Sequence, residues 1–123
     1  MLVRYATALL TLAGTLALIL GLLYWAGTAV HLMTMHMPLG LLTVGALWVS
    51  GIAQAAIKGG SWFIAASTAF VGAATIVFGL LHPALMVGEF HWIIQVVHLA
   101  LGILTIGLGH MAAARYREAS SPG

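Results

Sequence analysis

Histidine is the residue type in this sequence that stands out chemically. The 123-residue chain contains six histidines, as many as its Lys, Arg and Glu residues together. An imidazole ring binds metal ions through a ring nitrogen and exchanges protons near neutral pH. A polar side chain is costly inside a bilayer, so an intramembrane histidine is a functional candidate. Five of the six are expected in the outer half of the membrane: His31, His36, His82, His91 and His98.

The composition shows what surrounds these histidines. Hydrophobic residues make up 63% of the chain and charged residues only 5%, whereas a soluble domain carries about 25% charged residues. We therefore predict an integral membrane protein that contacts the lipid bilayer. The absence of cysteine excludes disulfides, zinc-thiolate sites and covalently attached haem. With no aspartate, no nucleotide-binding loop, and Glu89 and Glu118 expected on opposite sides, nothing indicates a stand-alone hydrolase or transferase.

Apolar runs define the elements that position the histidines. A transmembrane helix needs roughly 20 mainly apolar residues, and four such runs follow one another without an internal charge. They predict an all-α, four-transmembrane-helix bundle formed as a single domain by residues 1–123. The expected spans are about 5–25, 39–57, 62–81 and 92–114.

The basic residues predict the orientation of the chain. Arg4, Lys58, Arg115 and Arg117 all fall on one side of the predicted bundle. Because Lys and Arg gather in cytoplasmic flanks, we expect both termini in the cytoplasm, as in a bacterial inner-membrane protein. The four cations read as topology signals and indicate no nucleic-acid partner.

The second and fourth spans contain a shared pattern, H-x-x-L-G-x-L-T-x-G. It covers residues 36–45 and again residues 98–107. The first and third spans also match, through Gly14 and Gly72 and the residues that follow them. The chain therefore reads as a duplicated helical hairpin, with a pseudo-two-fold axis along the membrane normal. Chance is the competing explanation, because Leu and Gly abound in membrane helices.

The repeat predicts a site between two helices. At 100° per residue, the His, Gly and Thr of each pattern share one helix face. Two histidines at similar depth offer one imidazole to each face of a haem iron. Small residues on the same faces leave room for the flat ring. The predicted haem-binding residues are His36, Gly40 and Thr43 on one helix, and His98, Gly102 and Thr105 on the other.

Other ligand sets stay open. Thr34 is a candidate N-cap and Pro38 suits a first helical turn, which places His36 near the start of its helix. His31 could replace His36 as an iron ligand, and His91 could replace His98. A lone histidine here could also just bond a backbone carbonyl.

These features resemble the small membrane b-type cytochromes of the cytochrome b561-like kind. The resemblance rests on the two hairpins, the glycine stripes and the H-x-x-L-G segments that begin at His36 and His98. It implies bis-histidine haem b and electron exchange with a quinol or a periplasmic carrier. Such proteins usually hold a second haem near the cytoplasmic side. Here only His110 lies there, and its repeat partner is Trp48, so we expect one haem.

Two further interpretations compete with the cytochrome. The segment from His31 through Met33, Met35, His36 and Met37 gathers soft ligands at the outer membrane edge, and thioether and imidazole groups suit Cu(I). The chain would then bind or pass copper, although methionines also fill apolar gaps. Alternatively, the chain is a cofactor-free accessory subunit of a respiratory or photosynthetic complex. Other membrane subunits or a second copy of the chain are the expected protein partners.

Overall fold

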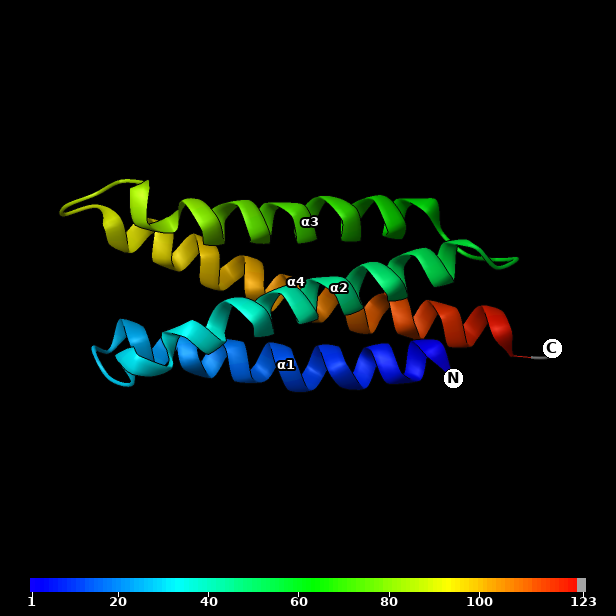
Figure 1. Cartoon of the computed structure of the whole chain (residues 1–123). Helices are drawn as coiled ribbons and strands as arrows, with labels where there is room; N and C mark the ends of the chain where they lie inside the picture. Colours follow the sequence, from blue (N-terminus) through cyan, green and yellow to red (C-terminus); the bar gives the residue numbers. More distant parts are fainter. Residues whose placement is uncertain (122–123) are drawn as a thin grey trace.

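Four long α-helices dominate the computed structural model, which describes residues 1–121 (Figure 1). Each is long and apolar enough to cross a membrane, so the prediction of an all-helical chain with four spans is confirmed. The helices are α1 (Leu2–Trp25), α2 (Met33–Ala55), α3 (Trp62–Leu81) and α4 (His91–Ser120).

The connections between the helices are short. A 3₁₀ turn, η1 (Val30–Leu32), precedes α2, and another, η2 (His82–Ala84), follows α3. Between α2 and α3, Gly59 has a φ of 86°, a left-handed conformation that favours glycine. Residues 1–121 contain no β-strand, as expected where the backbone must satisfy its own hydrogen bonds within lipid.

The helices pack around a central pair. α2 and α4 lie against each other, and each also contacts both α1 and α3. Within the described residues, α1 and α3 make no contact with each other. Figure 1 shows α2 and α4 between the two outer helices, with the N- and C-termini at the same end. A side chain on α2 can therefore reach one on α4 directly across the bundle.

Glycines allow this close packing. A Cβ added to Gly51 would collide with Thr68 of α3, and one added to Gly109 would collide with Leu10 of α1. Leu10 is fully buried. Small residues at helix contacts are the usual basis of association in a bilayer, since lipid leaves no hydrophobic driving force between helices.

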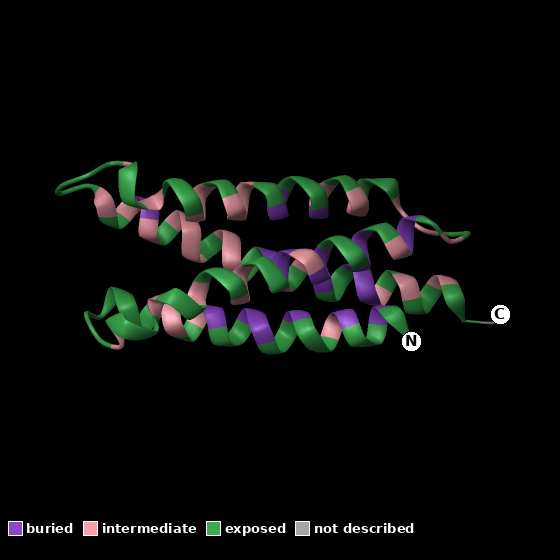
Figure 2. Ribbon diagram, viewed as in Figure 1, coloured by how far each residue is buried: buried purple, intermediate pink, exposed green. Residues whose placement is uncertain are grey.

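The packed core lies in the half of the bundle nearer the termini. Figure 2 shows buried residues there, whereas the opposite half is mostly half-buried or exposed. The central cluster joins Ala6 and Leu10 of α1 to Ala46 and Leu47 of α2. In the half away from the termini, Ile94 is the one buried residue that α4 contributes before Thr105. The bundle is therefore tightly packed at one end and loosely packed at the other.

The start of α2 differs from the sequence-based expectation. The helix begins at Met33 with Leu32 as its N-cap, so the proposal of Thr34 as the cap is wrong. η1 leads directly into α2 and removes the need for a side-chain cap. Pro38 consequently lies inside the helix rather than in its first turn. Because proline has no N–H, the helix lacks the backbone hydrogen bond that residue 38 would otherwise donate to the carbonyl of Thr34.

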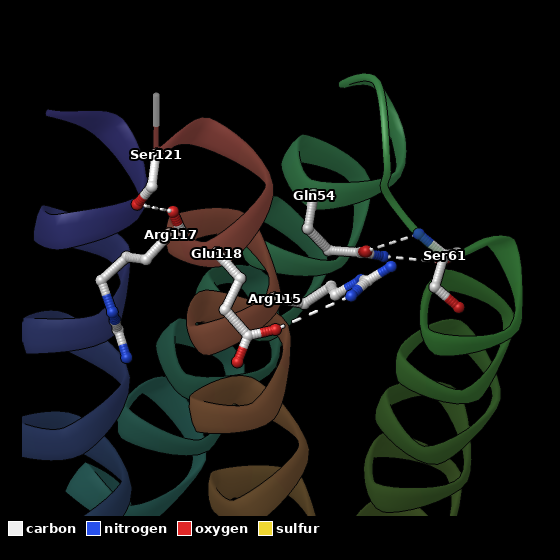
Figure 3. Close-up of polar contacts among 6 residues, drawn as sticks. All are labelled: Gln54, Ser61, Arg115, Arg117, Glu118 and Ser121. Carbon is white, nitrogen blue, oxygen red and sulfur yellow. Dashed lines mark hydrogen bonds and ion pairs between the residues drawn. The ribbon is translucent and has the colours of Figure 1, made fainter. Parts of the chain in front are cut away.

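A buried glutamine fixes the turn between α2 and α3. The Gln54 side chain is fully buried. Its Nε2 donates to the carbonyls of Gly51 (2.9 Å) and Ser61 (2.8 Å), and its Oε1 accepts from Ser61 N at 2.9 Å. The Gln54–Ser61 bonds are visible in Figure 3. Ser61 in turn caps α3 by accepting from Ile64 N at 3.3 Å.

Replacing Gln54 with Leu should destabilise the bundle. The change keeps the side-chain size but leaves the Ser61 N–H without its partner, at a cost of about 1–3 kcal/mol. The Ser61 carbonyl still accepts from Ala65 N at 3.2 Å. Denaturant unfolding of the purified protein measures the loss. Ser67→Ala, which removes an exposed bond to the Phe63 carbonyl, is the control and should change stability by less than about 0.5 kcal/mol. Equal stability of the two variants would contradict the assigned role of Gln54.

Candidate functional site

The loosely packed half of the bundle contains a cavity of about 510 Å³ between the four helices. Its size falls within the range of about 300–1,000 Å³ that is typical of small-molecule and cofactor sites. Leu18, Ile76 and Leu99 are among the apolar residues on its wall, and Tyr24 and Trp25 lie at the end of α1. The cavity therefore offers an apolar environment with a few polar groups.

All six predicted haem-binding residues line this one cavity. The rings of the two histidines approach each other edge-on across the α2–α4 contact, with centroids 6.1 Å apart and planes at 60°. Both histidines are half-buried. The structure thus brings together residues that are far apart in the sequence: His36, Gly40, Thr43, His98, Gly102 and Thr105.

The His36 ring is held in one orientation by a backbone carbonyl. Its Nδ1 lies 2.9 Å from the carbonyl oxygen of Ala17 in α1. A carbonyl only accepts, so Nδ1 carries the proton and donates it. In the neutral ring, the lone pair is then on the other nitrogen, Nε2, which can bind a metal ion. This arrangement is the usual one for a metal-binding histidine, because the carbonyl fixes both ring orientation and tautomer.

His98 has an unsatisfied ring nitrogen. Its Nδ1 is buried and has no hydrogen-bond partner among the described residues. A buried polar atom left without a partner costs about 1–3 kcal/mol. Such an atom in a native protein calls for an explanation, and one explanation is a functional role.

Each of the two rings packs against a glycine of a neighbouring helix. A Cβ added to Gly21 of α1 would lie 3.2 Å from Cε1 of His36, and one added to Gly79 of α3 would lie 3.1 Å from Cε1 of His98. Both glycines line the cavity. They let the imidazoles lie close to the flanking helices and keep the space between the rings clear.

The other predicted residues differ in how much free space surrounds them. A Cβ on Gly40 would meet nothing within 4 Å, whereas one on Gly102 would lie 3.1 Å from Leu18. Gly40 therefore faces open space, and Gly102 is partly covered. The Thr43 hydroxyl donates to the Leu39 carbonyl at 2.7 Å, so its proton is not available to a ligand.

Thr75 and Thr105 link α3 to α4 on the cavity wall. Their Oγ1 atoms lie 3.0 Å apart, and Thr75 Oγ1 also lies 2.8 Å from the Val71 carbonyl, to which it donates. Thr105 is buried. Both threonines line the cavity, so this bond joins α3 to α4 where the cavity meets the packed core.

His82 is a cavity residue that sequence reasoning did not select. It lies in η2, and its ring centroid is 5.9 Å from that of His98, as close as His36. It also approaches His91 at 4.8 Å. The only signal in the sequence was its position at the outer end of the third apolar run. His91 itself does not line the cavity, and its Nδ1 donates to the Leu85 carbonyl at 3.1 Å.

The remaining histidines lie elsewhere. His31 is exposed in η1 and is not part of the cavity wall. His110 lies in the half nearer the termini, where its Nε2 is 3.0 Å from Thr11 Oγ1. Of the methionines in the proposed copper cluster, Met33 and Met37 line the cavity, whereas Met35 does not.

Residues 1–121 contain no cluster of three or more His, Cys, Asp or Glu side chains placed to hold a metal ion. Three single histidines nevertheless line the cavity: His36, His82 and His98.

Comparison of the chain with protein-family models, with curated proteins and with solved structures finds no match. The function must therefore be inferred from the site itself.

The approach of His36 to His98 can be tested by cross-linking, because the chain has no native cysteine. In membranes, a short bifunctional thiol reagent should join the two cysteines of the double variant His36→Cys/His98→Cys. After the chain is cleaved between α2 and α4, the cross-link holds the two fragments together and shows as a shift in electrophoretic mobility. In the control pair, His36→Cys/His110→Cys, the second cysteine moves about 18 Å along α4, and no link should form. Equal yields from both pairs would show that the rings do not approach each other.

Proposed function

We propose that this chain is a membrane b-type cytochrome that carries electrons through one haem b held between His36 and His98. The observation that carries the proposal is the approach of these two imidazoles on the wall of a cofactor-sized apolar cavity. A bond from the iron to the unpartnered Nδ1 of His98 would also satisfy that buried atom.

Two imidazoles that held one iron would have to lie close together. The ring centroids of His36 and His98 are 6.1 Å apart. Gly40 would lie against the macrocycle, since its face of α2 is open.

The residues around the site would set the reduction potential of the haem and keep water away from it. Haem would supply one-electron redox chemistry when bound. The Ala17 carbonyl, by accepting from His36, raises the basicity of the free nitrogen and favours the oxidised, more positive iron. The apolar wall excludes water and limits side reactions with it.

The proposal includes a duplicated hairpin. Its support is that Gly21 packs on His36 as Gly79 packs on His98, and these pairs occupy matching positions in the two halves. The packed half gives similar support. A Cβ on Gly14 would meet Ile106, and one on Gly72 would meet Val44, which is the repeat partner of Ile106, as well as Trp48.

The setting we propose is a bacterial inner membrane with both termini in the cytoplasm. Arg4, Lys58 and Arg115 support this orientation through their position at one end of the bundle. The haem would then lie near the periplasmic side, within reach of a quinol or a periplasmic carrier. We propose that the chain works within a larger respiratory or photosynthetic assembly or as a homodimer, in line with its resemblance to cytochrome b561-like proteins.

Copper binding is the second candidate, because Met33 and Met37 line the same cavity as three histidines. Thioether and imidazole groups together suit Cu(I). Absorption separates the two candidates, since haem gives a Soret band and Cu(I) is silent.

Changing His98 to Ala should abolish haem binding, because it removes one axial bond and leaves a hole in an apolar site. Changing His36 to Ala should do the same or leave a five-coordinate, high-spin haem. Spectra of the purified variants measure both effects. His110→Ala is the control and should leave the spectrum unchanged, because that ring contacts Thr11 in the other half.

His82→Ala tests the pairing itself. Its ring is as close to His98 as that of His36, yet we expect the variant to keep a low-spin, six-coordinate spectrum. If His82 proves essential and His36 dispensable, the haem is held by His82 and His98. If the His98 variant keeps a six-coordinate spectrum, the site is wrong.

Changing Gly40 to Leu should weaken haem binding roughly ten- to hundredfold, because the new side chain would fill the cavity. Gly45→Leu is a matched control on the same helix. Neither glycine has a neighbour within 4 Å of an added Cβ, but Gly45 does not line the cavity. Haem content per chain, measured after titration of the purified protein with hemin, should fall only in the Gly40 variant. Equal losses would indicate a general effect of leucine on helix packing.

A further inference from the structure

A second hollow lies at the other end of the bundle, on its outer surface. This groove of about 770 Å³ runs between the first half of α1 and the last turns of α4. None of its described lining residues contributes to the histidine cavity. The lining residues are Met1, Val3, Arg4, Thr7, Ala8, Thr11, Leu12, Thr15, Tyr116 and Arg117.

The rim of the groove is basic. Arg4 and Arg117 both line it, and no lining residue is acidic. In Figure 3 the Arg117 side chain extends toward α1, whereas Arg115 points away from α1. Arg115 is paired with Glu118 at 3.7 Å. Arg4 and Arg117 form no salt bridge with the described residues, so their charges are available to an anion.

The rest of the groove is small and largely apolar. Ala8 and Leu12 are exposed on α1. Thr7 Oγ1 donates to the Val3 carbonyl at 2.7 Å, and Thr11 Oγ1 lies 2.8 Å from the Thr7 carbonyl. Because these hydroxyls bond back to their own helix, the threonines expose mainly their methyl groups, and the surface they form is shallow. Such a surface suits a hydrocarbon chain better than a polar solute.

The length of the groove matches one leaflet of a bilayer. From Arg4 to Thr15 the α1 axis rises about 16 Å, which is about half of the roughly 30 Å hydrocarbon core. The arginines and Tyr116 lie at the end where the headgroups are expected, since aromatic and basic residues favour that depth.

We propose that this groove binds one anionic phospholipid, with its phosphate between Arg4 and Arg117 and one acyl chain along α1. Basic pockets between transmembrane helices bind anionic headgroups in this way. The lipid would bridge α1 and α4, the first and last helices, which in this region also share the Thr11–His110 hydrogen bond and the packing of Leu10 on Gly109. This proposal does not depend on the haem.

The test measures lipid binding to the full-length protein in mild detergent by native mass spectrometry. Phosphatidylglycerol should remain bound at one copy per chain, and phosphatidylcholine should not. Each of Arg4→Gln and Arg117→Gln should weaken phosphatidylglycerol binding about fivefold, and the double variant roughly 25-fold, from the usual contribution of a basic residue near an anionic surface. Ala8→Trp, which fills the groove without altering charge, should also weaken it.

The double variant Lys58→Gln/Arg115→Gln is the matched control. It removes the same number of charges at the same end of the bundle but outside the groove, and binding should be unchanged. Equal loss in this control, or equal retention of both lipids by the wild type, would overturn the proposal. Displacement of phosphatidylglycerol by millimolar inorganic phosphate would show an anion site rather than a lipid site. A stable dimer without bound lipid would show that a second copy covers the groove.

Discussion

The contact between α2 and α4 is the interaction on which the rest of this molecule depends. These helices run side by side through the centre of the bundle, and α1 and α3 flank them without touching each other. A pair of neighbouring central helices can bring two side chains together across the bundle. His36 and His98 occupy such positions, with their rings 6.1 Å apart. Had α1 and α3 formed the central pair, the two histidines would lie on opposite outer helices.

Packing at one end of the bundle makes an open cavity possible at the other. A protein interior normally has few voids larger than a water molecule, and a cavity among helices weakens their association. Here the helices are held by the close contacts of Gly51 and Gly109 and by the Gln54 bonds at the turn. In the cavity half, His36 packs against Gly21 and bonds the Ala17 carbonyl, and His98 packs against Gly79. A bound cofactor would supply the missing contacts in this half.

Much of this architecture could be predicted because membrane constraints are strong. Four uninterrupted apolar runs leave little choice but four helices. The spacing of His, Gly and Thr at one helix face is a local property, so it predicted which residues of α2 and α4 would line a shared cavity. The start of α2 at Met33 could not be read from hydropathy, because the segment before Leu39 contains polar residues and a proline.

Contacts that depend on how helices meet were beyond the sequence. His82 lies in a connection, and only the approach of η2 to α4 brings its ring near His98. The face of α1 that contains Gly14 and Gly21 was recognisable, but not that Gly21 would pack on a histidine ring. Gly102 was expected to leave room for the ring, yet Leu18 of α1 covers part of that space. The groove at Arg4 and Arg117 was not predicted either, because these arginines had been interpreted only as signals for the orientation of the chain in the membrane.

The central claim is that one haem b lies between His36 and His98, and haem content is its most direct test. The chain is produced in haem-replete cells, purified in mild detergent and shown to be helical by circular dichroism. Pyridine haemochrome analysis should then give one haem b per chain, with a low-spin, six-coordinate spectrum in both redox states. A folded, helical protein with no haem, or with two haems per chain, would contradict the account.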